Sequence, residues 1–371
     1  MKFLLSGGGT AGHVTPAIAV AKELKRQFPK SEILFIGRDG GGENNAVIKS
    51  GIKLETIKIQ GLVRKLSIKN VEIILNAFKA KNEAERILQN FKPDVILGTG
   101  GYVCWPVLTA GRSMGIPILL HESNITPGLT TRLMSRKCDK VLLGKSETSH
   151  YFGSKVKAKT VGNPIDPSFY SLKKDTCRRK LKIKDEELFI LSFGGSGGAE
   201  KINKVIEEFI INYSTKHKDI RHIHATGNKY YDEKYKKCIN NESGCDIIPY
   251  IDKMATYLTA ADIVICRSGA MTIAEISATE TVPILIPSPN VSSNHQYLNA
   301  KHLSDHSAAI LIEEKNLTTE VLIDVVNRLK NDKNGRKTRA KNIKSYATPD
   351  AAKAIVSELV EYANSGKITI N

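Results

Sequence analysis

Three glycine-rich loops, each following a stretch with the composition of a buried β-strand, constrain the fold of this chain most strongly. The loops are Gly7–His13, Gly98–Tyr102 and Gly194–Ala199. Glycine has no Cβ and tolerates positive φ, so such loops let backbone N–H groups approach a phosphate closely. Two loops lie in the first third of the chain, and the third lies beyond residue 190. We therefore expect phosphate chemistry presented by two domains, at a cleft between them.

Short apolar runs rich in β-branched residues alternate with helical patterns along the whole chain. In the first half the predicted strands are Lys2–Ser6, Glu32–Gly37, Leu54–Ile59, Asp94–Thr99, Pro117–His121 and Lys140–Leu143. In the second half they are Leu188–Phe193, His222–Thr226, Asp246–Pro249, Asp262–Cys266, Val282–Pro287 and Ala308–Ile312. The alternation predicts two α/β domains, each a doubly wound, Rossmann-like parallel sheet with both faces covered. Ligands of such sheets bind beyond the carboxyl ends of the strands, where all three loops are expected.

Composition predicts a globular protein with anionic partners. A length of 371 residues suggests two domains, and we place the seam near Gly162–Pro164. No apolar run approaches the roughly 18 residues of a transmembrane helix, and six cysteines without a C-x-x-C pair favour a reducing cytoplasm. The net charge of +17 favours a nucleotide or an anionic membrane surface as partner. Nucleic acid is disfavoured, because aromatic residues are only 6% and no nucleic-acid module pattern is present.

Two predicted helices begin at the strand edge where a ligand would bind. Thr15 and Pro16 have the residue types of an N-cap and a first helical position. A second strand-to-helix junction runs from Cys266 to Glu275. Helix dipoles and N–H groups there would hold a diphosphate without a metal. Since no Asp-x-Asp cluster is present, we expect neither a metal nor another cofactor.

One rival interpretation is a dinucleotide-binding domain, because Gly7, Gly9 and Gly12 fit its glycine fingerprint. That fingerprint needs an acidic residue at the end of the second strand, where this chain has Gly37 and Arg38. It also leaves the second sheet and its glycine loop unexplained. We therefore disfavour it.

Seven motifs in order together resemble the MurG family of glycosyltransferases. They are Gly7–Pro16, Gly98–Tyr102, His121–Gly128, Val161–Pro164, Gly194–Ala199, Arg267–Glu275 and Asn294–Ala300. The resemblance implies a GT-B architecture and an inverting transfer of N-acetylglucosamine from UDP-GlcNAc to the 4-hydroxyl of undecaprenyl-pyrophosphoryl-MurNAc-pentapeptide, which converts lipid I to lipid II in peptidoglycan synthesis. A UDP-GlcNAc epimerase of similar fold and a nucleotide-sugar-binding regulatory protein remain alternatives.

The resemblance also implies how the domains divide the work. Residues 1–164 would form the domain that binds the acceptor and associates with the membrane, and residues 165–348 the domain that binds UDP-GlcNAc. A final helix, about 349–371, would pack back on the first domain. The protein would be peripheral on the cytoplasmic side of the inner membrane.

By the same resemblance, a set of residues would contact UDP-GlcNAc. They are Thr10, Ala11, Gly12, Asn124, Ser196, Ile251, Ala270, Met271, Thr272, Ile273, Ala274, Glu275, Gln296 and Asn299. Glu275 suits the ribose, because a carboxylate accepts hydrogen bonds from two vicinal hydroxyls. Two positions depart from the family. Ala11 stands where glycine is usual, and Asp166 stands where arginine is usual, so we leave Asp166 out of the site.

An inverting transfer needs a base for the acceptor hydroxyl, and His13 is our candidate. A helix N-terminus destabilises imidazolium, so a histidine there stays neutral and able to accept a proton. The alternative is that His13 only bonds a backbone group or phosphate. Glu122 is the reserve base, and its alternative role is a buried carboxylate that braces loops.

A basic, amphipathic segment predicts membrane contact. Arg64 and Lys65 precede Ile74, Leu75 and Phe78, which fall on one face of a predicted helix. The competing interpretation is that this stripe packs on the sheet. A second stripe, Ala77, Ala80, Ala84 and Ile87, is available for that packing.

Overall fold

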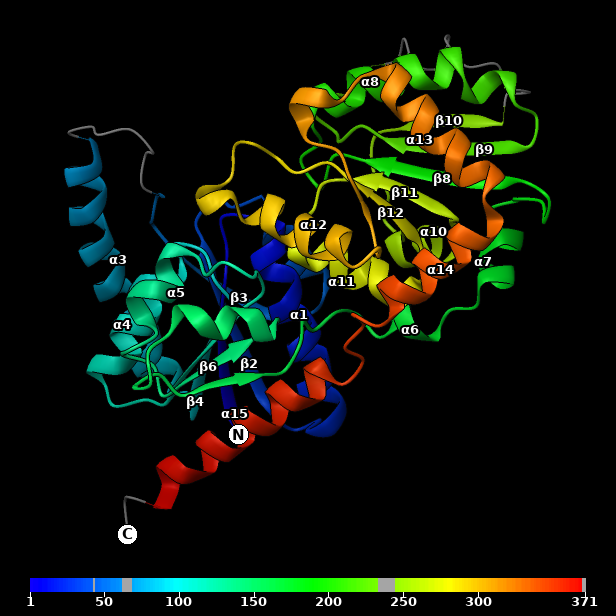
Figure 1. Ribbon diagram of the computed structural model, residues 1–371. Coiled ribbons are helices and arrows are strands. Elements are labelled where there is room, and N and C mark those ends of the chain that lie inside the picture. The colour runs from blue at the N-terminus through cyan, green and yellow to red at the C-terminus, as the bar shows by residue number, and fades with distance from the viewer. Residues whose placement is uncertain (43, 62–68, 233–243, 369–371) are drawn as a thin grey trace. The chain divides into compact units, whose positions relative to one another are not determined.

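The computed structural model describes residues 1–42, 44–61, 69–232 and 244–368 (Figure 1). Backbone contacts divide the chain into two compact units. Unit 1 is Met1–Ile165 with Thr348–Asn371, and unit 2 is Asp166–Ala347. Each unit is described by itself below.

Unit 1 is a parallel sheet covered by helices on both faces. Its strands are β1 (Lys2–Ser6), β2 (Glu32–Arg38), β3 (Lys53–Ile57), β4 (Val95–Gly98), β5 (Ile118–Glu122), β6 (Lys140–Leu143) and β7 (Ala158–Thr160). Its helices are α1 (Ala11–Gln27), α2 (Asn44–Lys49), α3 (Lys69–Phe91), α4 (Cys104–Ser113), α5 (Leu129–Met134) and α15 (Ala351–Ile368), with a 3-10 turn η1 (Ser146–Tyr151). The strand order is β3-β2-β1-β4-β5-β6-β7, so the order reverses between β1 and β4.

Alternate side chains of the buried strands pack into two apolar layers, one on each face of this sheet. Phe3 and Leu5 of β1 pack with α1 and α15, whereas Leu4 packs with α3 and α4 on the other face. The C-terminal helix α15 is fixed further by Glu358, whose carboxylate pairs with Lys140 at 2.5 Å and Lys159 at 2.7 Å. The end of the chain thus completes the fold of unit 1.

Unit 2 repeats the plan. Its strands are β8 (Leu188–Phe193), β9 (Ile220–Ala225), β10 (Cys245–Ile248), β11 (Ile263–Cys266), β12 (Val282–Leu285) and β13 (Ile310–Leu311). Its helices are α6 (Ser168–Ser171), α7 (Lys174–Lys180), α8 (Glu200–Asn212), α10 (Met254–Ala260), α11 (Ala270–Thr279), α12 (His295–Asp305), α13 (Thr319–Asn331) and α14 (Lys333–Lys344), with 3-10 turns η2 (Ser214–Lys216), η3 (Ser292–Asn294) and η4 (Glu314–Asn316). The order β10-β9-β8-β11-β12-β13 reverses between β8 and β11.

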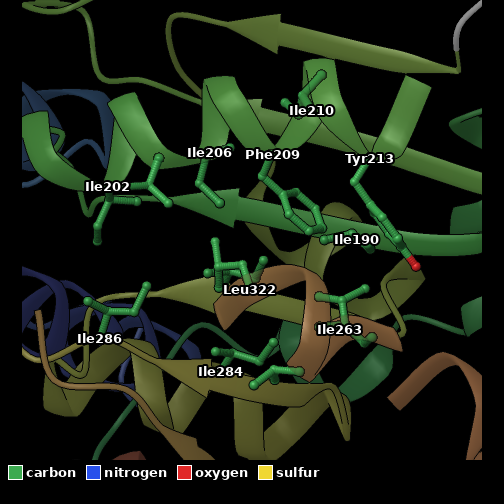
Figure 2. Packing of buried hydrophobic residues seen from close by; sticks show 14 of the residues in the cluster. Ile190, Ile202, Ile206, Phe209, Ile210, Tyr213, Ile263, Ile284, Ile286 and Leu322 are labelled. Atoms are coloured by element: carbon green, nitrogen blue, oxygen red, sulfur yellow. The ribbon is translucent and has the colours of Figure 1, made fainter. Parts of the chain in front are cut away.

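Helix α8 covers one face of this second sheet with a continuous apolar stripe. Ile202, Ile206, Phe209 and Ile210 recur at helical spacing and are almost fully buried. Figure 2 shows Ile206 and Phe209 pointing from α8 toward β8, with Ile190 of that strand beneath the helix. This packing holds the first turn of α8 directly after the glycine loop of β8.

All twelve predicted strands are confirmed to within a few residues, and two predictions fail. Strand β7 was not predicted, because Ala158–Thr160 is a short exposed edge without an apolar pattern. Helix α1 begins at Ala11 rather than at Thr15. The Thr15 hydroxyl donates to the Ala11 carbonyl at 3.0 Å, inside the helix, and Pro16 is also internal. His13 therefore lies in the first turn of α1.

Candidate functional site

The two glycine loops of unit 1 follow β1 and β4, the neighbouring strands at which the strand order reverses. The loops are packed backbone against backbone. The Gly8 N–H donates to the Gly100 carbonyl at 3.4 Å, and a Cβ on Gly101 would lie 1.9 Å from the Gly8 oxygen. Gly101 also has a φ of +83°, which side chains rarely adopt. Only glycine therefore fits at position 101. The start of α1 lies at the same edge of the sheet, beyond the carboxyl ends of the strands, where ligands bind.

His13 lies against these loops. Its Nδ1 is 3.1 Å from the Gly8 carbonyl oxygen and 3.1 Å from the Thr10 hydroxyl. A carbonyl only accepts, so Nδ1 carries the hydrogen and the lone pair of the neutral ring resides on Nε2. A Cβ on Gly100 would lie 2.8 Å from the His13 ring. The loop thus fixes both the tautomer and the plane of the ring.

The predicted donor contacts Thr10, Ala11 and Gly12 form the N-cap and first positions of α1. The first N–H groups of a helix have no intrahelical acceptor. Here the His13 N–H is bonded to the Thr10 carbonyl at 3.1 Å, so the N–H groups of Ala11 and Gly12 precede the first such bond. Ala11, where the family usually has glycine, is the first residue of α1.

Glu122 braces the loop that follows β5. Its two carboxylate oxygens accept from the Asn124 N–H at 3.0 Å, the Asn124 side-chain amide at 3.1 Å, the Gly128 N–H at 2.9 Å and the Thr131 hydroxyl at 2.6 Å. Both oxygens of this carboxylate are thus engaged by donors of its own loop and of α5. The loop-bracing role of Glu122 is therefore the one that these contacts support, and Asn124 is the residue it orients.

Two further residues of this region, His121 and Cys104, have structural roles. His121 is buried and donates from Nε2 to the Gly162 carbonyl at 3.0 Å, and burial lowers the pKa of its ring. Cys104 is buried beside the Gly100 carbonyl, and desolvation raises the pKa of its thiol to about 11. Neither side chain has the properties of a group that exchanges protons near neutral pH.

In unit 2 the loops after β8 and β11 likewise flank the reversal of strand order. Ser196 is exposed in the first loop. In the second, Arg267 donates to the carbonyls of Ile286 and Pro287 at 3.2 and 3.1 Å and pairs with Glu314. Arg267 thus anchors the turn between β11 and α11.

The predicted segment Ala270–Glu275 forms the first turns of α11, with Gly269 as N-cap. Ala270, Met271, Ile273 and Ala274 are buried, so most of this segment can reach a ligand only through its backbone. The Ile273 N–H is bonded to the Gly269 carbonyl at 3.0 Å. Helix N–H groups available to an anion are therefore those before Ile273. Ile251 is also buried.

Glu275 is the one ionisable group of this turn. Burial first, and the nearby negative charge of Asp166 second, raise the pKa of its half-buried carboxyl to about 8. Ligand hydroxyls that donate to this carboxylate would stabilise its charged form. Asp166, which departs from the family pattern, thus acts on the site through Glu275.

The predicted sugar contacts Gln296 and Asn299 lie on α12. The Gln296 side-chain oxygen accepts from the Ser288 N–H at 2.9 Å. The backbone carbonyl of Gln296 accepts from the Ser268 hydroxyl, also at 2.9 Å. Asn299 is only 5% exposed and donates to the Ser268 carbonyl at 3.3 Å. These bonds tie α12 to the turn before α11, and for Asn299 they support a structural role over sugar contact.

A cavity of about 590 Å³ opens within unit 2 beside its glycine loop. Its lining includes Gly194, Gly198, Ala199, Glu200, Lys201, Lys204, Tyr230, Arg267, Ser288, Asn290, Gln296 and Glu314. Lys201 and Lys204, on the first turns of α8, were not predicted as site residues. Their spacing on a helix that starts at the glycine loop is the signal that could have found them. Within the described ranges, no cluster of three or more His, Cys, Asp or Glu side chains has the arrangement of a metal site.

Helix α3 carries the described part of the predicted membrane face. Leu75 and Phe78 are 59% and 54% exposed. The Phe78 ring packs edge-on against the Trp105 ring, with 5.8 Å between the ring centroids. Arg64 and Lys65 lie outside the described residues, as does the side chain of Ile74.

The opposite face of α3 meets the sheet, as expected. Ala80, Ala84 and Leu88 are fully buried in the layer that covers β1 and β4. None of the helices in the described part of the chain is both long and apolar enough to cross a bilayer.

Comparison with known proteins identifies the family of the chain. The Glycosyltransferase family 28 N-terminal domain matches residues 3–143, and the family 28 C-terminal domain matches residues 189–355. A protein of Acetivibrio thermocellus, 40% identical over 96% of both chains, is named UDP-N-acetylglucosamine--N-acetylmuramyl-(pentapeptide) pyrophosphoryl-undecaprenol N-acetylglucosamine transferase. A Bacillus subtilis protein of the same name is 37% identical and covers 97% of this chain and 99% of its own length.

Solved structures agree with this assignment. The crystal structure of Acinetobacter baumannii MurG superposes with a TM-score of 0.74 at 27% identity, covering 97% of this chain and 99% of that one. A Neisseria meningitidis UDP-GlcNAc 2-epimerase reaches a TM-score of 0.68 at 16% identity, which shows a shared fold only. The GT-B fold is therefore confirmed, and the chain belongs to glycosyltransferase family 28, among the MurG enzymes that its sequence motifs resemble.

Proposed function

We propose that this chain transfers N-acetylglucosamine from UDP-GlcNAc to the 4-hydroxyl of undecaprenyl-pyrophosphoryl-MurNAc-pentapeptide, the step from lipid I to lipid II. The observation that carries the proposal is the full-length identity of about 40% to relatives named for this reaction. Four of the seven motifs, Gly7–Pro16, Gly98–Tyr102, Gly194–Ala199 and Arg267–Glu275, also follow the strands that flank the two reversals of strand order, where ligands of such sheets bind.

Unit 2 would bind the donor. The glycine loop before α8 and the turn before α11 would offer backbone N–H groups to the diphosphate, with Ser196 in reach of it. Lys201 and Lys204 add positive charge to the cavity beside that loop. Glu275 would accept from the ribose hydroxyls. The N–H groups and the two lysines would thus balance the negative charge of a nucleoside diphosphate, and the proposal needs no metal ion.

Unit 1 would bind the acceptor and supply the base. In the reaction, the muramoyl 4-hydroxyl oxygen forms a bond to the anomeric carbon while the bond from that carbon to the UDP oxygen breaks. The hydroxyl proton passes to a base, and UDP leaves with the bonding electron pair. His13 suits this role, because its Nδ1–H donates to the Gly8 carbonyl and Nε2 carries the lone pair.

A transfer assay tests the proposal. Purified protein is incubated with labelled UDP-GlcNAc and a short-chain lipid I analogue. Label in the lipid product supports the proposal. Conversion of the free nucleotide sugar without transfer would identify an epimerase, and tight binding without either change would identify a regulatory protein, so both results contradict it.

We further propose that the face of α3 with Leu75 and Phe78 docks on the anionic cytoplasmic surface of the inner membrane, where the acceptor is anchored. Two large apolar side chains more than half exposed on one helix face provide an apolar surface that a bilayer interface could bury. The predicted contribution of Arg64 and Lys65 is on the order of 1 kcal/mol each at an anionic surface, and salt would screen it.

Sedimentation with anionic vesicles tests the docking face. The variant Leu75→Ser plus Phe78→Ser should lose most vesicle binding, and charge reversal at Arg64 and Lys65 should remove its salt dependence. Ile48→Ser is the control, because Ile48 is 60% exposed on α2, away from this face. Wild-type binding by the folded double variant at every salt concentration would exclude the α3 face.

A further inference from the structure

A chain of hydrogen-bonded polar side chains crosses the core of unit 2 and ends beneath its glycine loop. It links Ser214 of η2, His222 and His224 of β9, Ser192 of β8 and Asn203 of α8, all at most 5% exposed. Ser192 Oγ lies 2.9 Å from His222 Nε2 and 2.8 Å from His224 Nδ1. Ser214 Oγ lies 2.9 Å from His222 Nδ1, and Asn203 Oδ1 lies 3.2 Å from His224 Nε2.

One arrangement of hydrogens satisfies the links between the side chains of this chain. The Asn203 amide nitrogen donates to the Thr226 carbonyl at 2.9 Å, so its oxygen faces His224 and must accept from Nε2–H. In the neutral ring His224 Nδ1 then accepts from the Ser192 hydroxyl at 2.8 Å and gives no hydrogen to the Ser192 backbone carbonyl, which lies 3.1 Å from it. The Ser192 hydroxyl oxygen accepts from His222 Nε2–H. His222 Nδ1 accepts from Ser214. Both rings are neutral in this arrangement, and burial lowers the pKa of both, that of His224 to about 4.

The chain of hydrogen-bonded side chains ends at the Thr226 carbonyl, against which Gly198 of the glycine loop packs. A Cβ on Gly198 would lie 2.1 Å from the Thr226 oxygen, and a Cβ on Gly227 would lie 2.7 Å from the Gly198 nitrogen. Both glycines have positive φ, +75° and +84°. Gly198 also lines the cavity beside the loop. A shift of the Thr226 carbonyl would therefore displace Gly198 and the N–H groups around it.

We infer that Asn203 and His224 are positioning residues that hold the Thr226 carbonyl, and through it the glycine loop, in the geometry that binds the donor diphosphate. The inference rests on the proposed function of this loop. Apolar side chains would fill the same core without the cost of burying five polar groups. A chain of polar side chains linked in this way instead favours a single geometry, because each link constrains the next.

Ser214 provides a matched control, since it is the far end of the same chain and equally buried. UDP binding is measured by calorimetry for wild type, Asn203→Ala, His224→Ala, His224→Gln and Ser214→Ala, together with urea unfolding and steady-state kinetics. We expect the two alanine variants near the loop to weaken UDP binding about tenfold, or about 1.4 kcal/mol, with kcat nearly unchanged.

His224→Gln should recover part of the loss, because its amide can donate to Asn203. Ser214→Ala should lose stability and keep wild-type UDP affinity. If Asn203→Ala does not fold, Asn203→Leu, which fills the volume without a donor, takes its place.

The outcomes separate the inference from the function on which it rests. Failure of wild type to bind UDP would contradict the proposed function. Wild-type binding that persists in the Asn203 and His224 variants would overturn the inference alone. Equal weakening by Ser214→Ala would also overturn it, since the chain would then act only on general stability.

Discussion

Replacing Glu275 with glutamine separates what this carboxyl does for the fold from what it does for the donor. In the folded protein, burial and Asp166 raise its pKa from an ordinary 4.5 to about 8. The folded state therefore holds the Glu275 proton more tightly than the unfolded chain does. Its contribution to stability is complete below pH 4.5 and is lost as pH rises to about 8.

The size of this effect follows from the pKa difference. At about 1.4 kcal/mol for each pH unit, full burial would give a ceiling of about 5 kcal/mol at pH 8. The side chain is only half-buried, so solvent reduces this, and we expect about 2 kcal/mol. Glu275→Gln removes the ionisation and should unfold at higher urea concentration than wild type at pH 8, with nearly equal midpoints at pH 4.5.

The same variant should bind UDP worse. An ionised carboxylate accepts from both ribose hydroxyls, whereas the amide of glutamine has one accepting oxygen. Wild-type affinity should rise with pH up to about 8, because the donor needs the ionised form, and the affinity of Glu275→Gln should be flat. Asp166→Asn is the matched variant, and it should shift the wild-type profile to lower pH. A wild-type affinity that does not change with pH, or no gain in stability at pH 8, would refute this reasoning.

Three other changes have definite expected results. His13→Ala should lower kcat by about 100-fold or more with a nearly unchanged KM for UDP-GlcNAc, and unchanged kcat in stopped assays of product formation would remove His13 from the mechanism. Gly101→Ala should destabilise the protein by about 3 kcal/mol or more in urea unfolding, because its Cβ would overlap the Gly8 carbonyl. Burial opposes ionisation of Glu358, but hydrogen bonds from its two lysine partners hold the pKa of that carboxyl below the ordinary value. Ionised Glu358 therefore stabilises the folded state above its ordinary pKa, and this stabilisation is lost as pH falls. Glu358→Gln should lower the melting temperature at pH 7 and have less effect near pH 3.

Sequence predicted the strands well because buried parallel strands are nearly continuous apolar runs. It missed β7, since an exposed edge strand pairs through its backbone and leaves no apolar pattern. It misplaced the start of α1, since Thr15 and Pro16 have the residue types of a helix start yet are accommodated within the first turns. Local propensity marks a helix terminus only where tertiary contacts do not extend the helix.

The candidate site was predicted through its glycines more securely than through its side chains. Gly101 and Gly198 are required by close backbone approaches and Gly100 by the nearby His13 ring, and such steric needs appear directly in a sequence. Hydrogen bonds between residues that are distant in the sequence do not appear in it directly. The four donors to Glu122 and the Asn203 link to Thr226 depend on loops and elements that only the fold brings together.

The structure of the reaction product tests the proposed transfer most directly. After incubation with UDP-GlcNAc and a short-chain lipid I analogue, the product is isolated, and proton NMR determines its linkage and anomeric configuration. An inverting attack by the muramoyl 4-hydroxyl predicts a β-configured N-acetylglucosamine on that oxygen, with one UDP released for each disaccharide. An α-linked product, attachment to another oxygen, or UDP release without a disaccharide would contradict the proposed reaction.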